Sequence, residues 1–96
     1  MQFIIHCLDH KELSVKRLEH YDAHKAYLAA SAGVKTVISG PLLAEDETTM
    51  IGSLFIVEAP SIEDVIEFNR NDPFKKAGIW RQIDINRFSM RVGKVA

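Results

Sequence analysis

The sequence has little cysteine and no long apolar run, and each absence excludes a class of protein. Cys7 is the only cysteine, so no intrachain disulfide can form, and a reducing cytoplasm fits this composition. The apolar stretch "MQFIIHCL" has no basic segment before it and meets charge at Asp9. It therefore predicts neither a signal peptide nor a membrane span. We expect a cytoplasmic protein with no membrane partner.

The chain also lacks an excess of either charge. Twelve Lys and Arg residues and 13 Asp and Glu residues give a formal net charge of −1. A nucleic-acid binder would normally show a basic stripe, so we expect no nucleic-acid partner. The 96 residues are 47% hydrophobic and 26% charged, which predicts one folded domain. A chain this short buries a limited share of its surface as a monomer, which favours a homodimer.

The apolar patterns predict six main elements in the order strand, helix, strand, strand, helix, strand. We expect strands at 1–8, 34–44, 50–59 and 79–88, and helices at 16–32 and 61–70. This order is that of a ferredoxin-like α+β fold, an antiparallel sheet with both helices on one face. The predicted domain spans residues 1–88, followed by a C-terminal tail at 89–96. The uncovered face of the sheet predicts a dimer with the two sheets face to face.

Local signals predict how these elements begin, end and face the core. Ser61 and Asp64 resemble a capping box, and Pro41 marks an edge or a break in its strand. Asp22 is predicted to cap a second segment of the first helix, and Gly33 to follow its end. The apolar side of the first helix would hold Leu18, Tyr21, Leu28 and Ala32. The corresponding side of the second helix would hold Ile62, Val65, Ile66 and Asn69. In the last strand, Ile79, Arg81, Ile83 and Ile85 alternate with Trp80, Gln82, Asp84 and Asn86.

The predicted strand directions bring several polar and small residues to one end of the domain. A histidine paired with a carboxylate is a general acid/base unit, because the carboxylate fixes the tautomer of the imidazole. An arginine could hold an anionic group of a substrate, and glycines allow a ligand close to the backbone. The residues that we expect at this end are Arg17, His24, Gly40, Pro41, Gly52, Ser53, Asp72 and Trp80.

Five segments, "YDAHKAYL", "VISGPLL", "GSLFIVEA", "NDPFKKAGIW" and the final strand, resemble the YCII-related (YciI-like) family over residues 1–88. The resemblance implies a dimeric α+β barrel with an active site built on His24 and Asp72. Gly40 and Pro41 match the "GP" of the family. The family often has Arg-Pro-x-His before this helix, whereas this chain has Tyr21-Asp22-Ala23-His24. Arg17 would then replace the family arginine from a different position.

The resemblance also implies a function. One activity in the family is elimination of HCl from a chlorinated trihydroxybenzene, a chlorinated hydroxyquinol. We expect a small enzyme without a cofactor, a lyase or isomerase, that transfers protons on a phenolic or lactone-like substrate. His24 and Asp72 would be catalytic, and Arg17, Gly40, Pro41, Ser53 and Trp80 would bind the substrate. The alternatives are a non-catalytic module that binds a small molecule and an accessory subunit of a larger enzyme.

Each of these residues also has a plainer interpretation. His24 could lie on the surface of its helix, and Asp72 could simply cap a short helix that begins at Pro73. A capping carboxylate could still face a cleft, so the two roles of Asp72 are compatible. His20 and His24 have the spacing of zinc ligands, but no recognised metal pattern supplies a third ligand, which would come from Asp22, His6 or His10. We therefore expect no metal, and an inert, buried thiol at Cys7.

Overall fold

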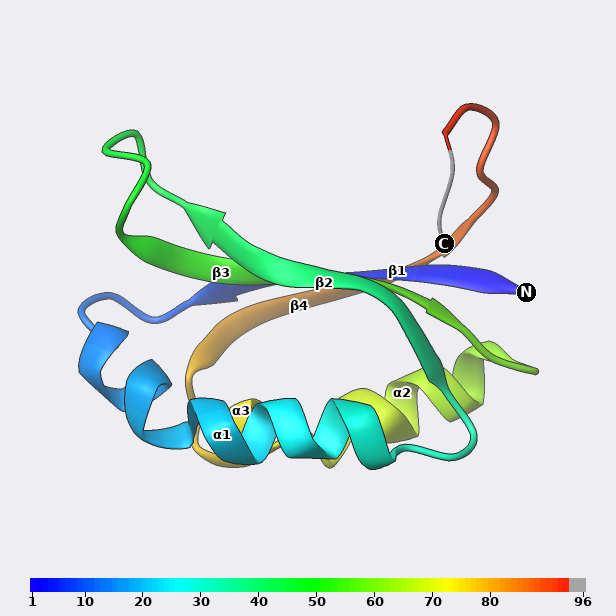
Figure 1. The fold of residues 1–96 in the computed structure, drawn as a ribbon, viewed down its shortest axis with the longest axis horizontal. Coiled ribbons are helices and arrows are strands. Elements are labelled where there is room, and N and C mark those ends of the chain that lie inside the picture. Colours follow the sequence, from blue (N-terminus) through cyan, green and yellow to red (C-terminus); the bar gives the residue numbers. More distant parts are fainter. Residues whose placement is uncertain (94–96) are drawn as a thin grey trace.

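The computed structural model describes residues 1–93 and consists of one sheet covered by helices on one face (Figure 1). The predicted ferredoxin-like order is confirmed, with one additional short helix before the last strand. The elements are β1 (Gln2–Asp9), α1 (Ser14–Ala30), β2 (Lys35–Leu43), β3 (Met50–Glu58), α2 (Ile62–Arg70), α3 (Pro73–Lys76) and β4 (Trp80–Phe88). The end of the predicted tail, 94–96, lies outside the described residues. Within residues 1–93, no helix is both long and apolar enough to cross a membrane.

The four strands form an antiparallel sheet in the order β2-β3-β1-β4. The strand β1 is apolar along most of its length because it is central and pairs with both β3 and β4. The strand β2 lies at an edge, where Pro41 costs no ladder hydrogen bond if its nitrogen faces outward. The edge assignment made from Pro41 is thus confirmed.

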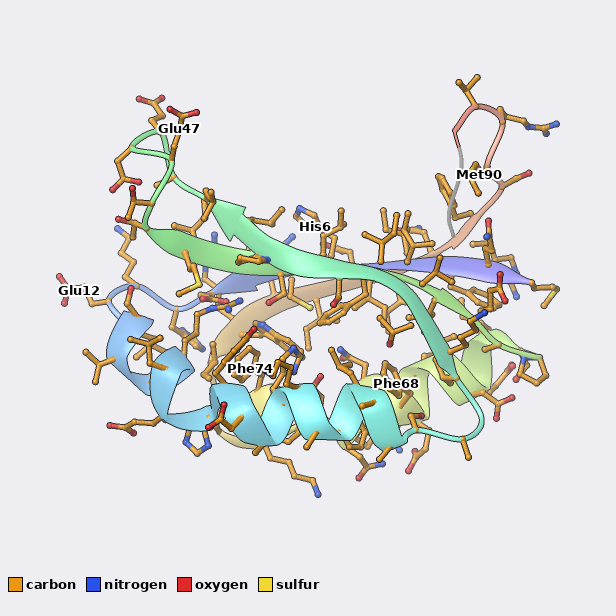
Figure 2. The ribbon with its side chains drawn as sticks, in the orientation of Figure 1. His6, Glu12, Glu47, Phe68, Phe74 and Met90 are labelled. Carbon is orange, nitrogen blue, oxygen red and sulfur yellow. The ribbon has the colours of Figure 1, made fainter. Side chains whose placement is uncertain are left out.

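The two faces of the sheet differ because side chains alternate along each strand. Phe3, Ile5 and Cys7 of β1 have no exposed surface and face the helices. Figure 2 shows Phe68 and Phe74 in the layer between helices and sheet, and His6 on the opposite side. That opposite side is bare in the described chain, and it carries apolar side chains from all four strands. These are Ile4, Leu8, Ile38, Leu42, Leu54, Ile56 and Phe88.

The helix α1 differs most from the sequence prediction. It is continuous from Ser14 to Ala30, so the predicted cap at Asp22 is wrong. The chain leaves the helix at Ser31 in an extended conformation, and Gly33 is not in the left-handed region that a capping glycine adopts. The buried side chains of α1 are two polar ones, Arg17 and His24. The predicted apolar side is wrong in part, because Leu18 and Tyr21 are 65% and 46% exposed and line a cavity described below.

The helices α2 and α3 begin at caps that the sequence predicts. The side chain of Ser61 accepts a hydrogen bond from the backbone N–H of Asp64. Asp72 does the same for the N–H of Phe74, with Pro73 at the first helical position. On α2 the buried residues are Val65, Phe68 and Asn69, whereas Ile66 is 41% exposed. Phe68 takes the place in the core that the prediction gave to Ile66.

The start of β4 is irregular, and this changes the direction of Trp80. The register between β1 and β4 shifts between Leu8 and Asp9, so that Asp9 pairs with Trp80. Simple alternation from Ile83 would turn Trp80 away from the helices, yet Trp80 is 6% exposed and packs in the core. The shift therefore adds an aromatic side chain to the helix side of the sheet.

Gly52 marks the closest approach between β3 and its neighbours. A methyl group there would overlap the carbonyl oxygen of Cys7 and lie 2.9 Å from Leu42 Cδ1. Because a strand backbone cannot yield easily, we expect Gly52→Ala to lower the free energy of unfolding by about 1–3 kcal/mol, as overpacking does. Gly33→Ala is the control, since nothing lies within 4 Å of its added carbon. Urea denaturation of both variants measures the difference, and equal stability of the two would contradict the register at Gly52.

The reactivity of the Cys7 thiol tests whether β1 is buried in the core. Burial raises the pKa of its thiol to about 12, and the buried carboxylates of Asp72 and Asp9 add to the effect. Since the thiolate is the reactive form, alkylation by iodoacetamide at mildly alkaline pH should be more than about 100-fold slower than for a free thiol. The same thiol should react fully in denaturant, as mass spectrometry would record. Fast alkylation of the folded protein would show that β1 is not buried as described.

Candidate active site

A buried histidine–carboxylate pair joins α1 to the start of α3. The imidazole of His24 is 6% exposed and Asp72 is fully buried. His24 Nδ1 lies 2.8 Å from Asp72 Oδ1, which also accepts the backbone N–H of Phe74 at 2.9 Å. An ionised carboxylate only accepts hydrogen bonds, so it fixes the proton on Nδ1 and leaves Nε2 able to take a proton. Asp72 thus acts as a helix cap and as the partner of His24 at once.

Aromatic rings hold the imidazole in one plane. Phe74 stacks on His24, with 4.0 Å between the ring centroids and 5° between the planes. Trp80 meets the imidazole edge-on at 6.4 Å, and Phe55 lies 5.7 Å away at a tilt. Because a stacked ring and an edge contact restrict rotation about different axes, the position of Nε2 is well defined.

Arg17 makes a second polar connection, between α1 and the sheet. Its guanidinium is buried, and its Nε donates to Asp9 Oδ2 at 2.6 Å. Its Nη2 donates to the carbonyl oxygen of Gly52 at 2.6 Å and to the hydroxyl of Ser53. The guanidinium also lies 4.9 Å from the centre of the Phe74 ring. Arg17 therefore fixes the first turns of α1 over β1 and β3, and most of its charge is offset by Asp9.

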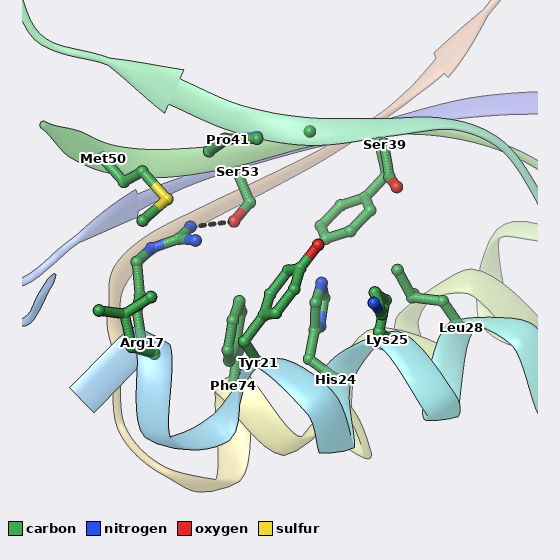
Figure 3. Close-up of a pocket in the computed structure, with 13 residues that line it drawn as sticks. Arg17, Tyr21, His24, Lys25, Leu28, Ser39, Pro41, Met50, Ser53 and Phe74 are labelled. Atoms are coloured by element: carbon green, nitrogen blue, oxygen red, sulfur yellow. Dashed lines mark hydrogen bonds between the residues drawn. The ribbon is translucent and has the colours of Figure 1, made fainter. Parts of the chain in front are cut away.

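Between α1 and the sheet lies a cavity of about 270 Å³, into which His24 opens (Figure 3). Of the residues predicted for the site, Arg17, His24, Gly40, Pro41 and Ser53 line it. Asp72 lies behind His24, and Trp80 packs behind the imidazole, outside the cavity wall. The structure adds lining residues that the sequence analysis did not select: Leu18, Tyr21, Lys25, Leu28, Ser39, Met50, Phe55 and Phe74.

Two of the missed residues, Tyr21 and Lys25, flank His24 on α1. A signal for them existed in the sequence, because Tyr21 lies three residues before His24 and Lys25 lies four residues after Tyr21, spacings that make side chains neighbours on a helix. Both are exposed, so their pattern resembles that of an ordinary solvated surface. None of the thirteen described residues that line the cavity is acidic. The cavity therefore combines apolar walls with nitrogen donors.

Two further observations concern the surroundings of the pair. The hydroxyl of Tyr27 donates to the carbonyl oxygen of Phe68 at 2.7 Å, which ties α1 to α2. Burial raises the pKa of this phenol, and the carboxylates of Asp72 and Glu67 raise it further, so it stays a donor. Within residues 1–93, no group of three His, Cys, Asp or Glu side chains could hold a metal ion. His20 lines a separate groove, beside Asn71 and Lys76.

Comparisons with known proteins agree with this fold. The family model of the YCII-related domain matches residues 1–89. Among solved structures, the chain is similar to the 5-chloro-2-hydroxyhydroquinone dehydrochlorinase TftG of Burkholderia phenoliruptrix AC1100, in complex with 2,5-dihydroxybenzoquinone. The two share 34% sequence identity over 93% of this chain and 94% of TftG, with a TM-score of 0.78. The comparison with curated proteins found no match. The chain described here belongs to the YCII-related family.

Proposed function

We propose that this protein is a lyase that transfers protons on a small aromatic substrate, with His24 as general base and Asp72 as its partner. The observation that carries the proposal is the buried His24–Asp72 hydrogen bond of 2.8 Å behind a cavity that His24 lines. In this arrangement Nε2 takes a proton from the substrate, and the Asp72 carboxylate stabilises the imidazolium that forms. The reaction requires no cofactor.

The reaction that we propose is loss of HCl from a chlorinated hydroxyquinol. The support is the 34% identity with TftG, which is named for such a reaction. Two phenolic O–H bonds break, one C–H bond forms at the carbon that bore chlorine, and the C–Cl electron pair leaves as chloride. One proton is released in sum, and the ring becomes a hydroxyquinone. In this proposal His24 takes the first phenolic proton and returns it to the ring carbon.

The other predicted site residues have different proposed roles. Gly40, Pro41 and Ser53 form the wall opposite α1, where the lack of a side chain at Gly40 leaves room for the ring. Arg17 lines the cavity and donates a hydrogen bond to the hydroxyl of Ser53. Its ion pair with Asp9 offsets most of its charge. Trp80 supports the imidazole from behind, and its part in substrate binding is indirect.

The base is tested by a variant that keeps a polar side chain but cannot transfer a proton. His24→Asn should lower turnover by roughly 10²–10⁴-fold, the usual contribution of a general base. His20→Asn, one turn earlier on α1 and outside the cavity, should leave turnover unchanged. The measurement is chloride release and quinone absorbance with a chlorinated trihydroxybenzene. If His24→Asn kept full activity, the assignment would fail; saturable binding by the wild type without any turnover would instead support a binding module.

We also propose that two copies associate through the bare face of the sheet. The support is its group of apolar side chains, which includes Ile4, Leu54 and Ile56 at the centre and the exposed side chains of Ile38 and Phe88. Monomeric proteins rarely leave an apolar patch of this kind in contact with water. Face-to-face packing of two sheets would remove it from solvent.

The association is tested by placing a charge on the bare face. Ile56→Glu should convert the dimer into a monomer, since an unpaired carboxylate between two sheets is strongly unfavourable. Ile66→Glu introduces the same change on α2, where the side chain is 41% exposed, and should keep the dimer. Light scattering after size exclusion gives both masses. A wild-type protein that is monomeric at micromolar concentration would contradict the proposal.

A further inference from the structure

The basic side chains that line the cavity differ in whether a carboxylate is paired with them. Three of its lining residues carry basic nitrogens, namely Arg17, His24 and Lys25. The first two are already paired, because Arg17 Nε contacts Asp9 at 2.6 Å and His24 Nδ1 contacts Asp72 at 2.8 Å. Lys25 forms no ion pair with any carboxylate that the structure describes. The net positive charge of the lining therefore comes from Lys25.

Lys25 is held at the cavity by its neighbour one helical turn earlier. Its Nζ lies 5.1 Å from the centre of the Tyr21 ring, within the range of a cation–π contact. Figure 3 shows Tyr21 rising from α1 towards β2, with His24 and Lys25 beside it. The ammonium group is thus positioned at the exposed side of the cavity, next to the imidazole rather than behind it.

The remaining walls and the volume restrict what can enter. About 270 Å³ lies just below the usual range of roughly 300–1,000 Å³ for ligand pockets, so the cavity suits a molecule with one ring. Flat or apolar side chains surround it on most sides, which favours a planar ring. The wall residues of this kind are Leu18, Tyr21, Leu28, Pro41, Met50, Phe55 and Phe74.

We propose that Lys25 is the residue that selects for charge in this site, by binding an ionised oxygen on a monocyclic phenol or hydroxyquinone. The ring would lie in the apolar cavity with one hydroxyl towards His24 and the ionised oxygen towards Lys25. The ligand class rests on the proposed function, but the role of Lys25 in binding does not depend on turnover. A charge-assisted hydrogen bond is stronger than a neutral one, so anions gain most from it.

The test measures binding with two probes of similar size by isothermal titration calorimetry. 2,5-Dihydroxybenzoquinone is ionised at neutral pH, whereas hydroquinone is neutral. Lys25→Gln should weaken binding of the anion by about tenfold and leave that of hydroquinone unchanged. Lys25→Arg should restore most of the affinity for the anion. Lys75→Gln, an equal change of charge at an exposed position outside the cavity, should behave as the wild type.

Salt dependence separates a charge effect from lost packing. Raising the ionic strength to about 0.15 M, where the Debye length is roughly 8 Å, should weaken anion binding by the wild type more than by Lys25→Gln. The inference is overturned if Lys25→Gln binds the anion as tightly as the wild type, or if the substitution weakens the binding of both probes equally. It is also overturned if the wild type binds neither probe. Failure of the proposed function would appear elsewhere, as absent chloride release or an active His24→Asn variant.

Discussion

The hydrogen bond between Asp72 and His24 is the constraint on which the candidate site depends. A carboxylate without exposed surface must receive donors from the fold, and Asp72 receives two, from the imidazole and from the backbone of Phe74. One donor belongs to α1 and the other to α3. The two segments are far apart in the sequence, so the position of the imidazole is determined by the tertiary structure.

The helix α1 is attached to the rest of the domain by two buried polar side chains, in addition to the partly buried Tyr27 and Leu28. Its buried residues are Arg17 and His24, which reach Asp9 on β1, Ser53 on β3 and Asp72. The cavity lies between α1 and the sheet beside these contacts, and Leu18 and Tyr21 are exposed where they line it.

Most of the fold could be predicted because its signals are local. The order of elements follows from apolar periodicity, and the caps at Ser61 and Asp72 follow from side chains that bond within three residues. The buried face of α1 could not be predicted, since periodicity assumes apolar burial and cannot anticipate a helix that buries an arginine. The face of the sheet on which the Trp80 side chain lies depends on a register shift between β1 and β4. The sequence of one strand does not reveal its register with the neighbouring strand. Strand directions correctly brought His24 and Asp72 together, but Tyr21 and Lys25 looked like solvated surface.

The short helix α3 has a consequence for how such a site can change. Its N-cap, Asp72, accepts from His24 Nδ1, and two residues later Phe74 stacks on the same imidazole. The groups to which we assign proton transfer are therefore concentrated in this segment and at one position of α1. Tyr21, Lys25 and Ser39, which line the cavity, contribute no described hydrogen bond to that segment. Substitutions at these three positions would change the lining of the cavity and leave the His24–Asp72 hydrogen bond intact, so under the proposed function recognition and chemistry can evolve separately.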